Sequence, residues 1–239
     1  MIPKNIHYCW FGRGEMPQLA KDCIASWHKF MPDWEYKLWN EDNFNVNYND
    51  YTREAYEAKK FAFVSDVVRL MAIKEYGGLY LDTDVEVFKS FDNLLSYTAF
   101  AGFEGSKHLP MGTCVMASEV GGEWVSEMLD AYRNRHFLLP DGTVDLTTNV
   151  QFITSIMASN GFRQDGEEQE YKNLHIFPVD FFSPRHTTGE YIRTENTYCD
   201  HKGLNSWSRS TLSWEEHILN IFKPKTRSSI IKVKRFLFG

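Results

Sequence analysis

Residues 75–88, which read EYGGLYLDTDVEVF, decide how the rest of the chain is organised. The adjacent residues Gly77 and Gly78 are typical of a helix end followed by a turn. The apolar residues 79–81 that follow them predict a short buried strand, and this strand runs into Asp82 and Asp84. Side chains two residues apart in an extended backbone project to the same side. We therefore expect the two carboxylates to lie close together.

Two close carboxylates repel each other at neutral pH unless a cation or a shared proton holds them. Mg²⁺ and Mn²⁺ prefer oxygen ligands, and they often combine one or two protein carboxylates with the oxygens of a substrate diphosphate. An Asp-x-Asp pair on its own is more often a solvated turn at a strand end. The sequence around the pair must therefore decide between a cation site and a simple turn.

The segments around the pair predict an α/β fold. Strands are expected at residues 5–11 and 34–39, with a helix at 18–30 between them. Such a strand–helix–strand unit builds a parallel sheet that binds nucleotide-sized ligands beyond the carboxyl ends of its strands. Further helices are predicted at 51–57, 61–75, 123–135 and 150–159, a strand at 111–117, and a strand with a turn at 174–184.

The helix predicted at 61–75 carries Asp66 and Arg69, which are three residues apart and therefore share one face. An acid and a guanidinium placed in this way could bind hydroxyls and phosphate, or they could form a surface ion pair. Helical periodicity alone favours the surface ion pair.

Composition limits the class of protein. The 239 residues, with 43% apolar and 24% charged side chains, suit one large globular α/β domain. The four cysteines form no C-x-x-C pair, so we expect reduced thiols in a cytoplasmic protein. We find no signal-peptide pattern and no run of about 18 apolar residues that would span a bilayer.

Charge is distributed unevenly along the chain. Residues 223–239 contain six basic and no acidic residues, so a net charge of −6 for the whole chain leaves −12 on residues 1–222. We expect one domain over 1–222 and a basic amphipathic tail over 223–239. The tail either lies on an anionic membrane face or packs or frays as an ordinary terminus. The acidic body argues against a nucleic-acid partner.

Short motifs from residue 2 to residue 207 resemble one known family. They are Ile2-Pro3-Lys4, Ile6-His7-x-x-Trp10-x-Gly12, Trp39-Asn40, Ser65-Asp66-x-x-Arg69, Gly77-Gly78-x-Tyr80-x-Asp82-x-Asp84, Thr148-Asn149 and Ser206-Trp207. In combination they resemble the capsular-polysaccharide-type sugar transferases of glycosyltransferase family 32. That family is related to yeast initiating α-mannosyltransferases and, more distantly, to the glucosyltransferase domains of clostridial toxins.

The resemblance implies a GT-A type nucleotide-diphospho-sugar transferase fold, with a Rossmann-like N-terminal βαβ region and a central mixed sheet. It implies a retaining, metal-dependent enzyme that moves a hexose or N-acetylhexosamine from a nucleotide sugar, most commonly a UDP-sugar. The acceptor would be a glycan or a lipid-linked glycan in capsular, exopolysaccharide or surface-glycan synthesis. A lipid-linked acceptor would suit an enzyme that associates with the inner membrane face through a basic tail.

The resemblance also implies roles for single residues. Asp84 would hold Mn²⁺ or Mg²⁺ against the donor diphosphate, and Asp82 would contact the ribose and assist the metal. Asp66 and Arg69 would bind donor-sugar hydroxyls, and Arg69 could also reach the diphosphate. Trp10 resembles the aromatic residue on which the base stacks, although a core position on the first strand is the simpler interpretation. The other donor-site residues would be Ser65, Tyr80, Asn149, Ser206 and Trp207.

Two of these assignments have simpler alternatives. Asn149 follows Thr148 at the start of a predicted helix, where a capping role is expected. Relatives often carry two histidines just before Ser-Trp, and here His201 and Lys202 occupy those positions. A lysine cannot ligate a cation but could hold phosphate, so His201 is the candidate third metal ligand. Trp207 could donate its indole N–H to the leaving phosphate.

Two other classes of function remain open at this point. Some phosphohydrolases use the first Asp of an Asp-x-Asp strand as a nucleophile, but their motif lies on the first strand and continues with Thr or Val where this chain has Glu86. A non-catalytic sugar- or cation-binding module would bind metal without turning over a nucleotide sugar.

Overall fold

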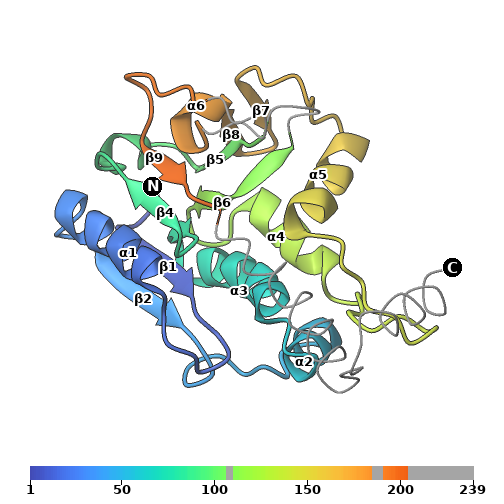
Figure 1. Ribbon diagram of the computed structural model, residues 1–239. Helices are drawn as coiled ribbons and strands as arrows, with labels where there is room; N and C mark the ends of the chain where they lie inside the picture. Colours follow the sequence, from blue (N-terminus) through green and yellow to red (C-terminus); the bar gives the residue numbers. More distant parts are fainter. Residues whose placement is uncertain (106–109, 185–190, 204–239) are drawn as a thin grey trace, which may run out of the picture. The chain divides into compact units, whose positions relative to one another are not determined.

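The computed structural model describes residues 1–105, 110–184 and 191–203 (Figure 1). The chain divides into two units, residues 1–204 and 205–239, and the second unit lies outside the described residues. The predicted boundary at residue 222 and the basic tail at 223–239 also lie outside them and stay predictions. The fold described below is that of the first unit.

A seven-stranded mixed sheet forms the centre of this unit, in the order β2-β1-β3-β6-β5-β8-β7. Strand β1 pairs in parallel with β2 and with β3, whereas β6 runs antiparallel to β3 and to β5. A separate two-stranded sheet joins β4 to β9. The strands are β1 (Asn5–Cys9), β2 (Glu35–Trp39), β3 (Gly78–Leu81), β4 (Val85–Val87), β5 (Ala99–Phe103), β6 (Met111–Ser118), β7 (Gln169–Tyr171), β8 (Leu174–Phe177) and β9 (Cys199–His201).

The helices follow the predicted periodicity closely. They are α1 (Gln18–Phe30), α2 (Asp50–Glu57), α3 (Phe61–Tyr76), α4 (Glu123–Ala131), α5 (Asn149–Ser159) and α6 (Val179–Phe182), with a 3₁₀ turn at Asp92–Leu94. The parallel unit β1–α1–β2 and the mixed sheet confirm the predicted architecture. Helix α4 ends four residues before the predicted end, and the segment 174–184 contains a short helix as well as the expected strand.

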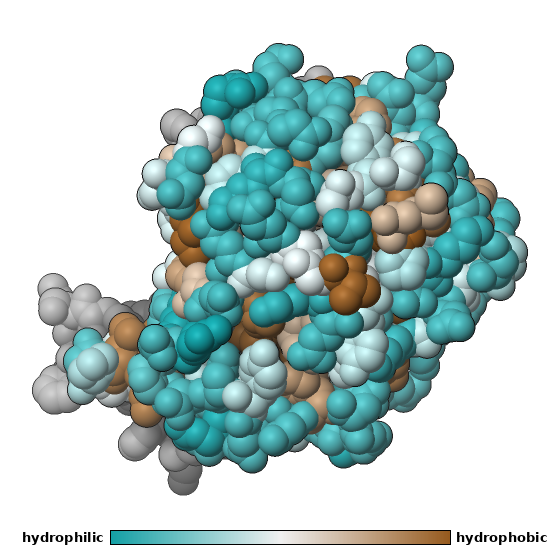
Figure 2. All heavy atoms as spheres, turned by 180° about the vertical axis from the view of Figure 1, so that it is seen from behind, coloured by the Kyte–Doolittle hydropathy of each residue, from teal (hydrophilic) through white to brown (hydrophobic). Residues whose placement is uncertain are grey.

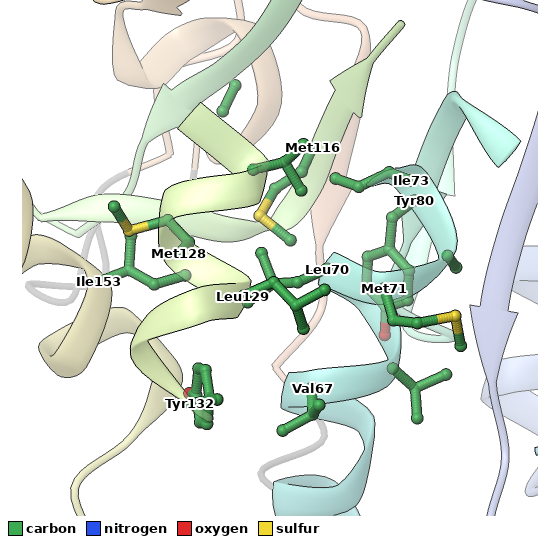
Figure 3. Close-up of a cluster of buried hydrophobic side chains, with 14 of the residues drawn as sticks. Val67, Leu70, Met71, Ile73, Tyr80, Met116, Met128, Leu129, Tyr132 and Ile153 are labelled. Carbon is green, nitrogen blue, oxygen red and sulfur yellow. The ribbon is translucent and has the colours of Figure 1, made fainter. Parts of the chain in front are cut away.

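Alternate residues of β3 supply two separate cores. Leu79 and Leu81 pack on one side of the sheet with Trp27 of α1, whereas Tyr80 packs on the other side against α3. Figure 3 shows this second core, in which side chains of α3, β3, β6, α4 and α5 meet. Each fully buried large apolar side chain stabilises the fold by about 1.5–3 kcal/mol. On the surface seen in Figure 2, hydrophilic side chains cover most of the molecule.

Gly77 and Gly78 form the turn between α3 and β3, with φ angles of +63° and +109°. A Cβ atom at Gly78 would lie 2.5 Å from the backbone oxygen of Asn5 on the neighbouring strand. Both the backbone conformation and the close approach therefore require glycine.

Replacing Gly78 with alanine is expected to destabilise the protein by about 2–4 kcal/mol, because left-handed strain costs roughly 1–3 kcal/mol and the β1 backbone must also move. Urea denaturation measures the change. Gly161→Ala is the matched control, because Gly161 has a similar φ of +99° but nothing within 4 Å of its Cβ position. Equal losses in the two variants would contradict the role of the close approach.

His7, the histidine of the Ile-His motif, connects three parts of this region. Its buried ring donates from Nε2 to the Gly77 carbonyl at 2.8 Å and accepts at Nδ1 from the indole N–H of Trp39 at 3.3 Å. The neutral ring satisfies both contacts, whereas a second ring proton would face the Trp39 donor. Burial lowers the pKa of His7 to about 4, with the Gly77 hydrogen bond opposing it.

This environment predicts a loss of stability in mild acid. The unfolded chain takes up a proton at His7 near pH 6.5, and the folded chain does so only near pH 4. Stability from His7 is therefore complete above pH 6.5 and falls by up to about 3 kcal/mol as the pH approaches 4. Unfolding free energies measured from pH 7 to pH 4 should show a shallower fall in His7→Gln. An unchanged slope in this variant would rule out His7 as the cause.

Candidate active site

The two aspartates of the acidic pair meet across a turn. Strand β3 ends at Leu81, and the Val85 N–H donates to the Asp82 carbonyl at 3.0 Å, so the backbone reverses between Asp82 and Asp84. The expected closeness of the carboxylates is present, but the expected extended backbone is not. The turn lies at the carboxyl end of β3, the edge at which parallel α/β sheets bind ligands.

Strand β9 brings a third candidate ligand to the pair. Val85 pairs with His201 in the antiparallel β4–β9 ladder, and the backbone N–H of Lys202 donates to the Asp84 carbonyl at 2.9 Å. The imidazole Nε2 lies 3.3 Å from Asp84 Oδ1. One ligand atom each from Asp82, Asp84 and His201 lie within 4.8 Å of one another. Two carboxylates and an imidazole in this arrangement could hold a divalent cation.

The charge on His201 depends on its neighbours. Burial opposes protonation of the ring, but the hydrogen bond to the Asp84 carboxylate and the charge of that carboxylate raise the pKa of His201 above its usual value.

Lys202, the other residue considered for this site, is engaged elsewhere. Its ammonium lies 2.6 Å from a Glu86 carboxylate oxygen and 2.8 Å from an Asp200 oxygen. Two carboxylates therefore already balance its charge. Of the two neighbouring residues, His201 is the one whose side chain contacts Asp84.

Arg69 connects helix α3 to the acidic pair. Its guanidinium lies 3.1 Å from Asp66 Oδ1 and 3.3 Å from Asp82 Oδ1, and it donates to the Thr113 carbonyl at 2.9 Å. The Tyr80 hydroxyl donates to Asp82 Oδ1 at 2.8 Å, and the Tyr80 ring lies under the guanidinium. Asp82 is thus held by a cation and a hydroxyl in a fixed orientation.

The predicted ion pair between Asp66 and Arg69 is present, but the prediction that it lies on the surface is wrong. Only 6–7% of each residue is exposed, because the helix that carries them is packed between the sheet, α2 and α4. Burial raises the pKa of Asp66 to about 6, with Arg69 opposing the shift.

A buried polar group lies next to Asp66. It consists of Tyr51, Tyr132, Arg135 and Asn149. Tyr132 donates to Asn149 Oδ1 at 3.1 Å, and the Arg135 guanidinium lies 4.8 Å from the centre of the Tyr51 ring. Three of its polar atoms have no hydrogen-bond partner among the described residues: Tyr51 OH, Arg135 Nη1 and Asn149 Nδ2.

Unpaired buried polar atoms are rare and call for a ligand, an ion or water to satisfy them. Sequence reasoning identified Asn149 and missed the other three members of the group. Tyr51 and Tyr132 look like ordinary apolar helix positions, and nothing in the local pattern marks Arg135. A residue of the Thr-Asn motif does cap α5, but it is Thr148, whose side chain accepts from the backbone N–H of Gln151; Asn149 is the first residue of the helix and not its cap.

Trp10 directly follows β1, so it lies at the same edge of the sheet as the acidic turn, because β1 and β3 are parallel. It is half-buried, belongs to neither core, and donates from its indole N–H to the Gly14 carbonyl at 2.6 Å. The core interpretation is therefore wrong. Ser65 is half-buried on α3, and its hydroxyl donates to the Phe61 carbonyl. Ser206 and Trp207 lie outside the described residues.

Comparison with known proteins identifies the same region. Residues 17–101 match the family described as "Glycosyltransferase sugar-binding region containing DXD motif". Inositol phosphoceramide mannosyltransferase 3 of Schizosaccharomyces pombe is 33% identical over 110 residues, which are 41% of this chain and 29% of that protein. Glucan organizing enzyme 1 of Cryptococcus neoformans is 38% identical over 82 residues, which are 31% of this chain and 22% of that protein. The chain thus spans less than a third of the length of these relatives.

Among solved structures, the PaToxG glycosyltransferase has a TM-score of 0.50 and 16% sequence identity, and the match covers 67% of this chain and 70% of that chain. This likeness concerns the fold alone. Together with the mixed sheet and the acidic turn, it defines a GT-A type glycosyltransferase fold. Over residues 17–101 the chain is similar to the DXD glycosyltransferases of the family 32 type. The phosphohydrolase alternative loses its support, because here the acidic pair follows the third strand of the chain.

Proposed function

We propose that this chain is a metal-dependent, retaining glycosyltransferase that moves a hexose or N-acetylhexosamine from a nucleotide sugar to a glycan acceptor. The observation that carries the proposal is the convergence of Asp82, Asp84 and His201 at the carboxyl edge of the sheet. A UDP-sugar is our preferred donor and a GDP-sugar is the second candidate. Three relatives are named inositol phosphoceramide mannosyltransferases, which supports a lipid-linked acceptor. The pathway that we propose is surface-glycan or capsular synthesis.

Asp82, Asp84 and His201 would hold the cation. Imidazole is a common ligand of transition metals, so this set of ligands suits Mn²⁺ better than Mg²⁺. When bound, the cation neutralises charge on the departing nucleoside diphosphate.

The chain's own residues would orient the donor. Trp10 offers an aromatic face to the base at the edge of the sheet. Arg69 holds a fixed positive charge beside Asp82, and a preorganised charge of this kind stabilises a developing anion without reorganisation. Asp66 would accept hydrogen bonds from the hydroxyls of the sugar, and the side-chain amide of Asn149 would donate a hydrogen bond to one of them. The remaining donor contacts that we propose come from Ser65, Tyr80, Ser206 and Trp207.

We infer that the acceptor hydroxyl attacks the anomeric carbon on the face that the leaving group vacates. The bond from this carbon to the diphosphate oxygen breaks, the new bond to the acceptor oxygen forms, and the acceptor proton passes to the leaving phosphate. Arg69 engages both Asp66 and Asp82, which lowers their availability as nucleophiles. A glycosyl-enzyme adduct detected by mass spectrometry would overturn this order of events.

A nucleotide-release assay tests the function. The protein is incubated with a panel of UDP- and GDP-sugars in Mn²⁺, with and without a chelator, and a reaction without protein serves as the blank. We expect slow, metal-dependent hydrolysis of one donor. Metal binding without release from any donor, even with added glycan acceptors, would favour the non-catalytic binding module.

Membrane association is a separate part of the proposal. No bilayer-spanning helix occurs within residues 1–105, 110–184 and 191–203. We propose a cytoplasmic enzyme that reaches the inner membrane face through the basic residues of 223–239. Deletion of 223–239 is expected to abolish sedimentation with liposomes that contain anionic lipid. Unchanged sedimentation would contradict the role of the tail.

A further inference from the structure

His201 belongs to a second group of metal-ligating side chains. One ligand atom each from Glu104, Cys114 and His201 lie within 4.8 Å of one another. Cys114 is a free, buried thiol on β6, and Glu104 directly follows β5 and is half-buried. The group therefore combines a carboxylate, a thiol and an imidazole at the side of His201.

An irregularity in the sheet creates this arrangement. The register of β5 and β6 shifts between Ala101 and Phe103, so β6 has extra residues opposite Gly102. Gly112 lies in this stretch, and a Cβ atom there would come within 3.4 Å of the Glu104 carboxylate and 2.9 Å of the Gly102 carbonyl. The absence of a side chain at Gly112 lets β6 lie close to the Gly102 carbonyl, and the Glu104 carboxylate lies beside the same position.

Strand β6 also fixes the position of Cys114 relative to the acidic pair. The Asp82 N–H donates to the Cys114 carbonyl at 2.9 Å, which extends the β3–β6 ladder by one residue. The backbone of Asp82, from the first group of ligands, is thus hydrogen-bonded to the backbone of Cys114, from the second group. His201 belongs to both groups.

We propose that Glu104, Cys114 and His201 form a second cation site, which takes a borderline or soft cation such as Zn²⁺. Zinc commonly binds sulfur, imidazole nitrogen and carboxylate oxygen together, whereas a hard cation such as Mg²⁺ prefers oxygen ligands. The cation replaces the thiol proton of Cys114 and the proton of the His201 imidazolium, and both protons leave to solvent. The remaining coordination positions would be filled by water.

Sharing His201 makes the two sites compete. A cation held by Cys114 and Glu104 draws the imidazole away from Asp84, which lies 3.3 Å from Nε2. Zn²⁺ therefore inhibits turnover that depends on Mn²⁺. This consequence rests on the proposed function, whereas occupation of the second site by a cation does not.

Cobalt is the probe, because Co²⁺ substitutes for Zn²⁺ and a thiolate ligand gives a charge-transfer absorption in the near ultraviolet. The full chain, stripped of metal, is titrated with Co²⁺. We expect this absorption in the wild type and its loss in Cys114→Ser. Cys23→Ser is the matched control and retains the band, because Cys23 is a buried, free thiol on α1 outside both groups of ligands. Zn²⁺ added afterwards should remove the cobalt band.

Glu104→Gln is a second variant that leaves the thiol in place. It is expected to weaken Co²⁺ binding at least about tenfold without abolishing the band. Urea denaturation of each variant shows whether it is folded. No band in the folded wild type, or a band that persists in Cys114→Ser, would overturn the proposal. Neither result depends on nucleotide release, so failure of the second site and failure of the proposed function are distinguishable.

Discussion

Replacing Asp84 with asparagine is expected to lower kcat/KM for the donor identified by nucleotide release by at least about 100-fold, because the proposed cation would supply several kcal/mol of charge stabilisation and each 1.4 kcal/mol is tenfold in rate. The amide keeps the size of the side chain but lacks its charge. Asp84 is 8% exposed and contacts His201, so loss of its carboxylate would weaken the proposed set of cation ligands. Nucleotide release measured over a series of Mn²⁺ concentrations gives both the rate and the affinity for metal.

Glu86→Gln is the control for this experiment. Glu86 lies two residues after Asp84, on β4, its side chain is 41% exposed, and it pairs with Lys202. Its replacement is expected to change the rate less than about threefold, since an exposed ion pair contributes only 0–1 kcal/mol. Equal losses in the two variants would indicate a general effect of negative charge, and an unchanged rate in Asp84→Asn would remove this residue from the metal site.

Replacing Arg69 with methionine is expected to destabilise the protein by about 3–5 kcal/mol, because the change leaves the buried carboxylate of Asp66 and the half-buried carboxylate of Asp82 without their cation. The guanidinium touches Asp66, Asp82 and the Thr113 carbonyl, and it is buried. Arg69→Lys keeps the charge but cannot make all three contacts, so an intermediate loss is expected. The measurement is the free energy of unfolding in urea.

The chain offers a close control for Arg69. Asp130 near the end of α4 and Arg133, two residues beyond that helix, have the same residue types at the same spacing, at 2.7 Å, but the Arg133 side chain is 71% exposed. Arg133→Met is expected to cost less than about 1 kcal/mol. The double variant Asp66→Asn/Arg69→Met should be more stable than Arg69→Met, because it also removes one of the two carboxylate charges that Arg69→Met leaves without a cation. A similar cost for Arg69→Met and Arg133→Met would show that burial does not decide the strength of the pair.

This comparison also explains what local sequence pattern could not predict. Asp66 with Arg69 and Asp130 with Arg133 are equivalent as helical patterns, and burial follows only from what packs against each helix. Helix α3 is covered by α2, α4 and the sheet, and the alternation of apolar residues along α3 does not state which polar residue is enclosed. The same limit hid Tyr51, Tyr132 and Arg135, which come together from two separate segments, helix α2 and the stretch after α4.

Short sequence patterns were sufficient to predict those elements whose structure depends only on residues close together in the sequence. Pro17 precedes α1 and the apolar spacing within it is regular, so its bounds could be predicted to the residue. Gly77 and Gly78 marked the turn before β3 because both adopt positive φ. The position of His201 depends on pairing between β4 and β9, which are far apart in the sequence, and only the family resemblance pointed to it.

The pairing of β4 with β9 also sets the order in which the site can be completed during synthesis. Strands β1, β2, β3 and β6 leave the ribosome well before β9, so the central sheet can begin to form while His201 is still being made. Contacts between segments far apart in the chain form late, because closing a long loop is entropically costly. A nascent chain that stops before Cys199 would have most of the sheet and both aspartates, but not the third side chain that would close the cation site.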